Sequence, residues 1–480
     1  MWAMSLNIGM IQGKRTCKMK KERLINRYKV LTLEEEDHWD YRGKNNSERD
    51  FVHGFCTYPA MMVPKMQREM LDVYLEEIGT NKIWLLDPFV GSGTILVEGM
   101  LRGLNVVGID INPLAILLCK AKTTIVLPQT LCQKSSDLLT KIFISQEVEE
   151  YKFDGITKWF TPQAIKALSI IRVKIMEEPS IELRRFFWAT FCEVIRVVSN
   201  SRDCTYKLHI KTKEEIDAYD KDALEIFKST LEYNIQRYLE FYDELKKHKL
   251  IKKDGITYKY SINIILGDSI EYLKECRKKY DVVFTSPPYG DNHTTVSYGQ
   301  YSVLPLRWIN CHDIDENVNM ELLNTQCAID KISLGGKRVI DKKYRERLQN
   351  KSEILRNQLN EIENKAANQV DKIVSFYFDM DAFLNILSKR LKKDSISVWT
   401  VGNRQVAKQE IYMNKIVIEL AERYGLSLLT SFTRKITMKR MPETNAYSGD
   451  NKGLQVTMTR EHILILGRGD LDDGRTNSTF

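Results

Sequence analysis

The stretch KIWLLDPFVGSGTILVEGMLRGLNVVGIDINPLAILLCKAKT, residues 82–123, decides the fold. Its first six residues predict a short buried strand, and the glycine-containing turn after them leads into a helix. NVVGIDI then predicts a second strand, and PLAILLCKAKT a second helix. This alternation begins a parallel, doubly wound sheet, a class that binds ligands beyond the carboxyl ends of its strands.

The flanking sequence both extends and interrupts this alternation. Before it, the apolar spacing predicts a helix that ends at Gly79. After it, residues 125–250 form a long helical block, and strands resume with SINIILGD and YDVVFT. A second interruption spans about 306–372, and its charged part, 341–371, predicts an exposed helix.

The C-terminal part returns to alternation. It predicts a helix at 379–391, a strand at 395–403, a helix at 411–424 and a final antiparallel strand pair. The expected fold is therefore an α/β, Rossmann-like core, mostly parallel with an antiparallel C-terminal hairpin, carrying a large helical insertion and a second, smaller insertion. The expected parts are an N-terminal arm at 1–50, the core at 51–125, 259–305 and 373–467, insertions at 126–258 and 306–372, and a tail at 468–480.

Composition excludes several classes of protein. The 480 residues are 43% hydrophobic and 28% charged, which is ordinary for a globular protein. No apolar run approaches the ~20 residues of a membrane span. The N-terminus has its positive charges after the apolar stretch, the reverse of a secretory signal, so we expect a cytoplasmic protein. Nine cysteines without a CxxC pair or zinc spacing predict no metal site.

The net charge of +8 permits nucleic-acid binding without demonstrating it. The charge is concentrated in the arm KRTCKMKKERLINRYK, residues 14–29. We expect a solvated arm there, and a phosphate-contacting arm is the alternative.

The first chemical motif is LLDPFVGSGT followed by GIDINP. Gly91 and Gly93 allow the backbone to approach a ligand closely, and Asp110 ends the second strand, where a carboxylate can accept both ribose hydroxyls. An NAD site needs a third glycine, but Leu96 stands there, and Asp87 would repel a pyrophosphate. Asp87 near an ammonium or sulfonium favours S-adenosylmethionine instead.

The second motif is TSPPYG, residues 285–290, directly after an apolar strand. Ser286 and the carbonyl of Pro287 offer acceptors to an exocyclic amino group, and Pro288 constrains the turn. Tyr289 offers a face for stacking an extruded base, so its ring should matter more than its hydroxyl.

Together, DPFVGSGT, GIDINP and TSPPY resemble the amino-methylating DNA methyltransferases, and the SPPY form is most similar to their N4-cytosine branch. HGFCTYPAMMVP resembles the family's methionine-contacting segment, and LGDS lies where the family has an adenine-contacting acidic residue. The resemblance implies catalytic residues Ser286, Pro287, Pro288 and Tyr289. It implies cofactor-binding residues Tyr58, Pro59, Asp87, Pro88, Phe89, Gly91, Gly93, Thr94, Asp110, Ile111 and Asp268.

The function implied is transfer of a methyl group from S-adenosylmethionine to the N4 amino group of a flipped cytosine in double-stranded DNA. A restriction-modification role with a separate restriction endonuclease goes with it. Three alternatives stay open: an adenine N6 DNA methyltransferase, an RNA amino-methyltransferase, and a DNA-binding specificity subunit without activity.

Target recognition is expected outside the core motifs. Residues 306–372 are favoured because they follow the catalytic turn, and the insertion at 126–258 is the alternative. Two further features stay open: residues 292–301 are either ligand contacts or a packed polar loop, and Asn403 is a weaker candidate for the base pocket.

Overall fold

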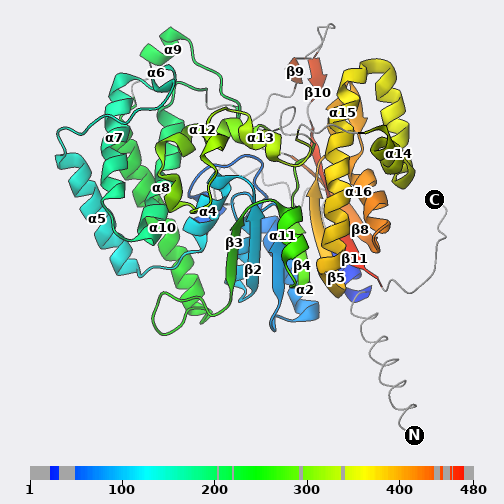
Figure 1. Cartoon of the computed structure of the whole chain (residues 1–480). Coiled ribbons are helices and arrows are strands. Elements are labelled where there is room, and N and C mark those ends of the chain that lie inside the picture. Colours follow the sequence, from blue (N-terminus) through cyan, green and yellow to red (C-terminus); the bar gives the residue numbers. More distant parts are fainter. Residues whose placement is uncertain are drawn as a thin grey trace.

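A sheet lies at the centre of the molecule (Figure 1). The structure is a computed structural model that describes residues 22–31, 49–202, 205–218, 221–290, 296–336, 341–436, 444–446, 454–456 and 458–469. Within these residues the main sheet has seven strands in the order β3-β2-β1-β4-β5-β11-β8. Its strands are β1 (Trp84–Asp87), β2 (Asn105–Asp110), β3 (Ile262–Leu266), β4 (Tyr280–Thr285), β5 (Leu391–Val401), β8 (Leu426–Lys435) and β11 (Arg460–Arg468).

The direction of these strands confirms the predicted fold class. The neighbours from β3 through β5 pair in parallel, whereas β11 pairs antiparallel with both β5 and β8. From β1 the chain proceeds to β2 and β3 on one side and then to β4 and β5 on the other. The order therefore reverses between β1 and β4, which is where such sheets form a ligand crevice.

Helices cover both faces of the sheet and form an additional lobe. The lobe, coloured cyan to green in Figure 1, lies beside β3 and contains most of the first predicted insertion. Its helices are α5 (Pro128–Ile144), α6 (Ile156–Trp159), α7 (Pro162–Met176), α8 (Ile181–Val198), α9 (Lys213–Asp217) and α10 (Ala223–Lys247).

The remaining elements belong to the core or to its loops. The helices are η2 (Phe51–Gly54), α2 (Pro64–Ile78), α3 (Thr94–Leu101), α4 (Pro113–Thr123), α11 (Ser269–Glu275), α12 (Tyr298–Trp308), η3 (Cys311–Asp313), η4 (Met320–Leu323), α13 (Ala328–Ile332), α14 (Lys342–Lys351), α15 (Glu353–Arg390) and α16 (Met413–Glu422). Two small hairpins are β6 (Arg404–Val406) with β7 (Gln409–Ile411), and β9 (Thr444–Ala446) with β10 (Leu454–Val456).

The central strands send alternate side chains into two separate cores. In β1, Leu85 belongs to the core on the α2, α4 and α8 side, whereas Leu86 belongs to the core on the α15 and α16 side. Successive residues of a strand point to opposite faces, so a strand buried on both faces reads as a continuous apolar run. None of the described helices combines the length and apolar character that a bilayer crossing requires.

The segment predicted to be an exposed helix at 341–371 forms α14 and the first part of α15; most of its residues are exposed as expected, but one face of α15 packs on the core. The second part of the 341–371 segment is the first half of α15. This helix continues past a kink at Ala366 and ends at Arg390. Leu355, Leu359 and Ile362 of this half are fully buried against the second core. The spacing of these three residues puts them on one face of the helix, and the exposed polar residues Arg356, Asn357, Asn360 and Glu361 occupy the other face.

Residues 22–31 of the basic arm form a helix that packs on α2. Leu24 and Tyr28 are buried, and the Tyr28 hydroxyl donates to the carbonyl of Met70 over 3.0 Å. Arg27 pairs with Glu76 and Glu77 of α2. This half of the arm is therefore folded onto α2 and is not free chain, and residues 14–21 lie outside the described part.

Candidate active site

A cavity opens at the carboxyl ends of β1, β2, β3 and β4 and gathers most of the residues predicted from the sequence. Eleven of them line it: Tyr58, Pro59, Pro88, Phe89, Gly91, Thr94, Asp110, Ile111, Asp268, Ser286 and Pro288. Four others do not line it: Asp87, Gly93, Pro287 and Tyr289. The cofactor-type motif and the catalytic-type turn therefore face one common space.

The turn after β1 requires glycine at two positions. Gly91 and Gly93 have φ angles of +49° and +80°, in the left-handed region that side chains disfavour. A Cβ on Gly93 would also approach the Cys119 sulfur of α4 to 3.1 Å. The turn can therefore lie close against α4, and the edge of the cavity at Gly91 carries no side chain.

Asp110 joins this turn to the end of β2. Its Oδ2 accepts from the Gly91 amide over 2.9 Å, and its Oδ1 accepts from the Asn112 amide over 2.9 Å. Removal from bulk water raises its pKa to about 6, against the lowering effect of these hydrogen bonds. Each oxygen retains a lone pair, so the carboxylate can still accept hydroxyl donors from a ligand in the cavity.

Asp87 is more deeply enclosed than the sequence suggested. It is fully buried, and its Oδ1 accepts from the Phe89 amide and from the Thr285 hydroxyl of β4. Burial raises the pKa of this carboxyl to about 7. Its position supports a role in joining the ends of β1 and β4 and in setting the local electric field, rather than direct contact with a ligand.

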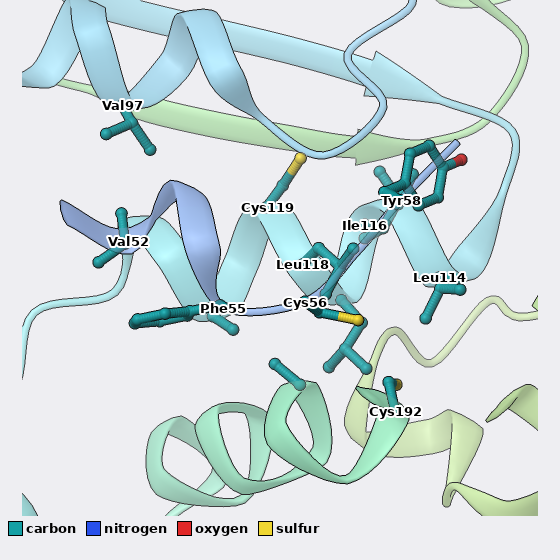
Figure 2. Packing of buried hydrophobic residues seen from close by; sticks show 14 of the residues in the cluster. Val52, Phe55, Cys56, Tyr58, Val97, Leu114, Ile116, Leu118, Cys119 and Cys192 are labelled. Atoms are coloured by element: carbon teal, nitrogen blue, oxygen red, sulfur yellow. The ribbon is translucent and has the colours of Figure 1, made fainter. Parts of the chain in front are cut away.

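The loop around Tyr58 closes one side of the cavity. The Asn112 side chain donates to the Tyr58 hydroxyl over 3.0 Å and to the Ser302 hydroxyl of α12 over 2.8 Å. Tyr58 also packs against the ring of Tyr298, with centroids 5.8 Å apart. Figure 2 shows the preceding residues of this loop, including Phe55 and Cys56, packed among apolar side chains of neighbouring helices.

Asp268 lines the cavity and is the residue before α11. Its Oδ1 accepts from the Ile270 amide over 2.7 Å and from the Glu271 amide over 3.2 Å, which is the geometry of a helix N-cap. The second oxygen of this carboxylate remains an acceptor for a ligand group. Pro88, Phe89 and Ile270 add apolar surface to the same cavity, as a flat heterocycle requires.

The catalytic-type turn follows β4. Ser286 lines the cavity, and its hydroxyl lies 3.3 Å from the hydroxyl of Tyr289. The Tyr289 hydroxyl donates in turn to Oε1 of Glu461 over 3.1 Å. Burial raises the pKa of Tyr289 well above its usual range. A Cβ on Gly402 would lie 2.6 Å from the Tyr289 ring, so this ring is packed against the residue that follows β5.

Comparison with known proteins reveals a relative of full length. The chain is 34% identical over 460 residues to the type II methyltransferase M.MvaI of Kocuria varians, covering 93% of this chain and 97% of that protein. This chain belongs to the type II methyltransferases. It is also 24% identical over 301 residues to the type II methyltransferase M.BsoBI of Geobacillus stearothermophilus, covering 55% of this chain and 54% of that protein. No protein-family model matches it.

Membership of this family implies S-adenosylmethionine as the methyl donor of the methyltransferase. The cavity suits that molecule in three respects. The glycine turn leaves room for close approach, Asp110 offers acceptors for hydroxyls, and the apolar surface beside Asp268 suits a heterocycle.

Several cavity residues of the methyltransferase were not predicted from the sequence. Most of them come from segments without a recognisable motif, namely Tyr298, Ile329, Ile332, Ser333, Leu334 and Asp379, whereas Asn112 lies within GIDINP. Tyr298 lies within the stretch 292–301, which was left open as ligand contacts or packed loop, and residues 292–295 lie outside the described part. Only Asn112 had a local signal, because an Asn before Pro-Leu at the start of a helix predicts an N-cap.

Asn403 does not line the cavity of the methyltransferase. Its amide donates to Glu410 of β7 over 3.0 Å, and it lies 3.2 Å from the ring of His462. These contacts connect the β6–β7 hairpin to β11, so the structure gives Asn403 a structural role.

Proposed function

We propose that this methyltransferase transfers a methyl group from S-adenosylmethionine to the N4 amino group of a cytosine flipped out of double-stranded DNA. The observation that carries the proposal is that Ser286 faces the same cavity as Asp110 and the glycine turn. A donor held by the turn and by Asp110 would therefore lie within one enclosed space with an amine held by Ser286.

The proposed roles follow from what each residue can offer. Asp110 binds the ribose hydroxyls, Asp268 accepts from the adenine amino group, and the Tyr58 loop covers the methionine part. The cofactor supplies an electrophilic methyl group on a sulfonium. The target amine is a poor nucleophile because its lone pair is delocalised into the ring. Acceptance of its hydrogens by Ser286 and by the Pro287 carbonyl favours a pyramidal nitrogen whose lone pair can attack.

DNA as the substrate, with a separate restriction endonuclease as a partner, is proposed from the likeness to type II methyltransferases. A base inside a duplex cannot reach an enclosed cavity, so the proposal includes base flipping.

For target recognition we propose residues 306–352, a narrower range than the sequence suggested. The later residues up to 372 belong to α15 and contribute to the core. The test exchanges residues 306–352 with those of a relative of different specificity and then sequences the methylated sites. An active chimera that keeps its original site would move recognition to the helical insertion at 126–258.

To test the function, the full chain is incubated with methyl-labelled S-adenosylmethionine and plasmid DNA. The modified nucleoside is then identified by mass spectrometry. N4-methylcytosine is the expected product. N6-methyladenine would replace the cytosine assignment, and label in RNA alone would replace DNA as the substrate. Specific DNA binding without any methyl transfer would favour the specificity-subunit alternative.

A further inference from the structure

Glu461 and Arg434 form a fixed ion pair behind the catalytic-type turn. The two residues are direct cross-strand partners on β11 and β8. The Arg434 guanidinium donates to Oε2 of Glu461 through Nε at 2.8 Å and approaches it through Nη2 at 2.6 Å. Both side chains are largely buried, at 10% and 14% exposure. The pair fixes the Glu461 carboxylate in place, and its other oxygen faces Tyr289.

This carboxylate gives direction to the hydrogen bonds that lead to the cavity. A carboxylate can only accept, so the single hydroxyl proton of Tyr289 is donated to Oε1 of Glu461. The Tyr289 oxygen then accepts the hydroxyl proton of Ser286 across 3.3 Å. With its own proton engaged, Ser286 presents only lone pairs to the cavity that it lines.

A serine hydroxyl alone is a poor destination for a proton, because a protonated alcohol is strongly acidic. The carboxylates that line the cavity are elsewhere: Asp110 ends β2 and Asp268 follows β3, on the far side of β1 from the catalytic-type turn, and Asp379 of α15 accepts from the Gly335 amide. Among the described residues, the hydrogen bonds of Ser286 therefore lead through Tyr289 to the carboxylate of Glu461.

Resting on the proposed function, we propose that Glu461 is a positioning residue that holds Ser286 as an acceptor toward the target amine and receives the amine proton through Tyr289. As the amine lone pair forms the new N–C bond, the S–C bond breaks and its electrons stay on sulfur. The cationic nitrogen then gives a proton to Ser286, which passes its own proton to Tyr289, and Tyr289 passes its proton to Glu461. The protonated carboxyl then releases this proton to solvent.

The test is a double-mutant cycle on single-turnover methyl transfer with Glu461→Gln, Tyr289→Phe and the combined variant. In Glu461→Gln the amide oxygen pairs with Arg434 and the NH₂ group faces Tyr289, so the direction of the hydrogen bonds reverses. Loss of a positioned transition-state hydrogen bond costs about 100-fold in rate. We expect that loss for each single variant, with unchanged affinity for DNA and cofactor, and no further loss in the double variant.

Glu419→Gln is the matched control, because Glu419 also accepts a serine hydroxyl but lies on α16, outside the cavity lining. It should transfer methyl groups at the wild-type rate. The inference is overturned if Glu461→Gln keeps the wild-type rate, or if the two losses multiply in the double variant. Tyr289→Phe leaves the Glu461–Arg434 pair intact, so it still reports on the connection if Glu461→Gln does not fold.

The double-mutant cycle and the test of the proposed function can fail independently of each other. A wild-type enzyme that methylates adenine N6 would refute the cytosine assignment, yet the cycle could be measured on that amine. A wild-type enzyme that methylates cytosine N4, with multiplicative losses in the cycle, would refute only the role of Glu461.

Discussion

The backbone amide of Gly91 donates to Oδ2 of Asp110 over 2.9 Å, so the turn after β1 and the end of β2 are held together at one edge of the cavity. The same carboxylate accepts from the Asn112 amide. Asp110 therefore organises the backbone around the cavity in addition to offering acceptors to a ligand.

We expect Asp110→Ala to weaken S-adenosylmethionine binding by about 2–4 kcal/mol, roughly 30- to 1,000-fold, because two charge-assisted hydrogen bonds to the ribose are lost. Calorimetry measures the affinity, and thermal unfolding checks that the variant is folded. Asp72→Ala is the control, since Asp72 pairs with Arg102 and does not line the cavity. An unchanged affinity in folded Asp110→Ala would remove the assignment.

Asp87 should make the stability of the protein pH-dependent. Burial raises its pKa to about 7 from the ordinary value of 3.8, so between these pH values the folded state binds more protons than the unfolded state. The unfolding free energy should therefore fall as pH rises through this window, with a contribution from Asp87 of at most about 4 kcal/mol. Asp87→Asn removes this contribution.

Urea unfolding of wild type and Asp87→Asn at pH 5 and pH 8 measures the effect. Asp110 contributes in the same direction, because its pKa is also raised, to about 6, so only the difference between the two proteins belongs to Asp87. If the unfolding free energy changes equally with pH in the two proteins, Asp87 is ionised in the folded state throughout this pH window.

The sequence predicted the part of the site that depends on local structure. The turn at Gly91, the end of β2 at Asp110 and the turn at Ser286 each follow a strand directly, and parallel strands bring their carboxyl ends to one edge. The residues that were missed reach the cavity by long-range packing. Nothing near Asp379 or Leu334 in the sequence indicates that α15 and the end of α13 close the same space.

The side chain of Tyr289 shows why a motif does not determine orientation. The string SPPY predicts an aromatic face for stacking, and the structure adds that the hydroxyl bonds to Glu461, which lies 172 residues later in the chain. The position of Glu461 depends on the register of β11 against β8. Such a register arises from the packing of whole strands and leaves no signal beside the motif.

Ser286→Ala should lower the rate of methyl transfer by about 100-fold and leave DNA and cofactor binding nearly unchanged, because the lost hydrogen bond strengthens as the amine becomes pyramidal. Single-turnover methylation and separate binding assays distinguish these effects. The control is Ser333→Ala, since Ser333 also lines the cavity but donates to the carbonyl of Ile329 within its own segment. Wild-type transfer by Ser286→Ala would contradict the proposed chemistry.

Leu359→Ala tests whether the first half of α15 is a core element. Its side chain is fully buried, and truncating a buried leucine costs about 2–5 kcal/mol. Asn360→Ala is the control, because Asn360 is the exposed next residue of the same helix and its truncation should change stability by less than about 0.5 kcal/mol. Urea unfolding measures both. The pattern of methylated sites should stay the same in both variants, because this face of α15 packs on the core. A stable Leu359→Ala variant with altered sites would instead make this half of α15 a recognition element.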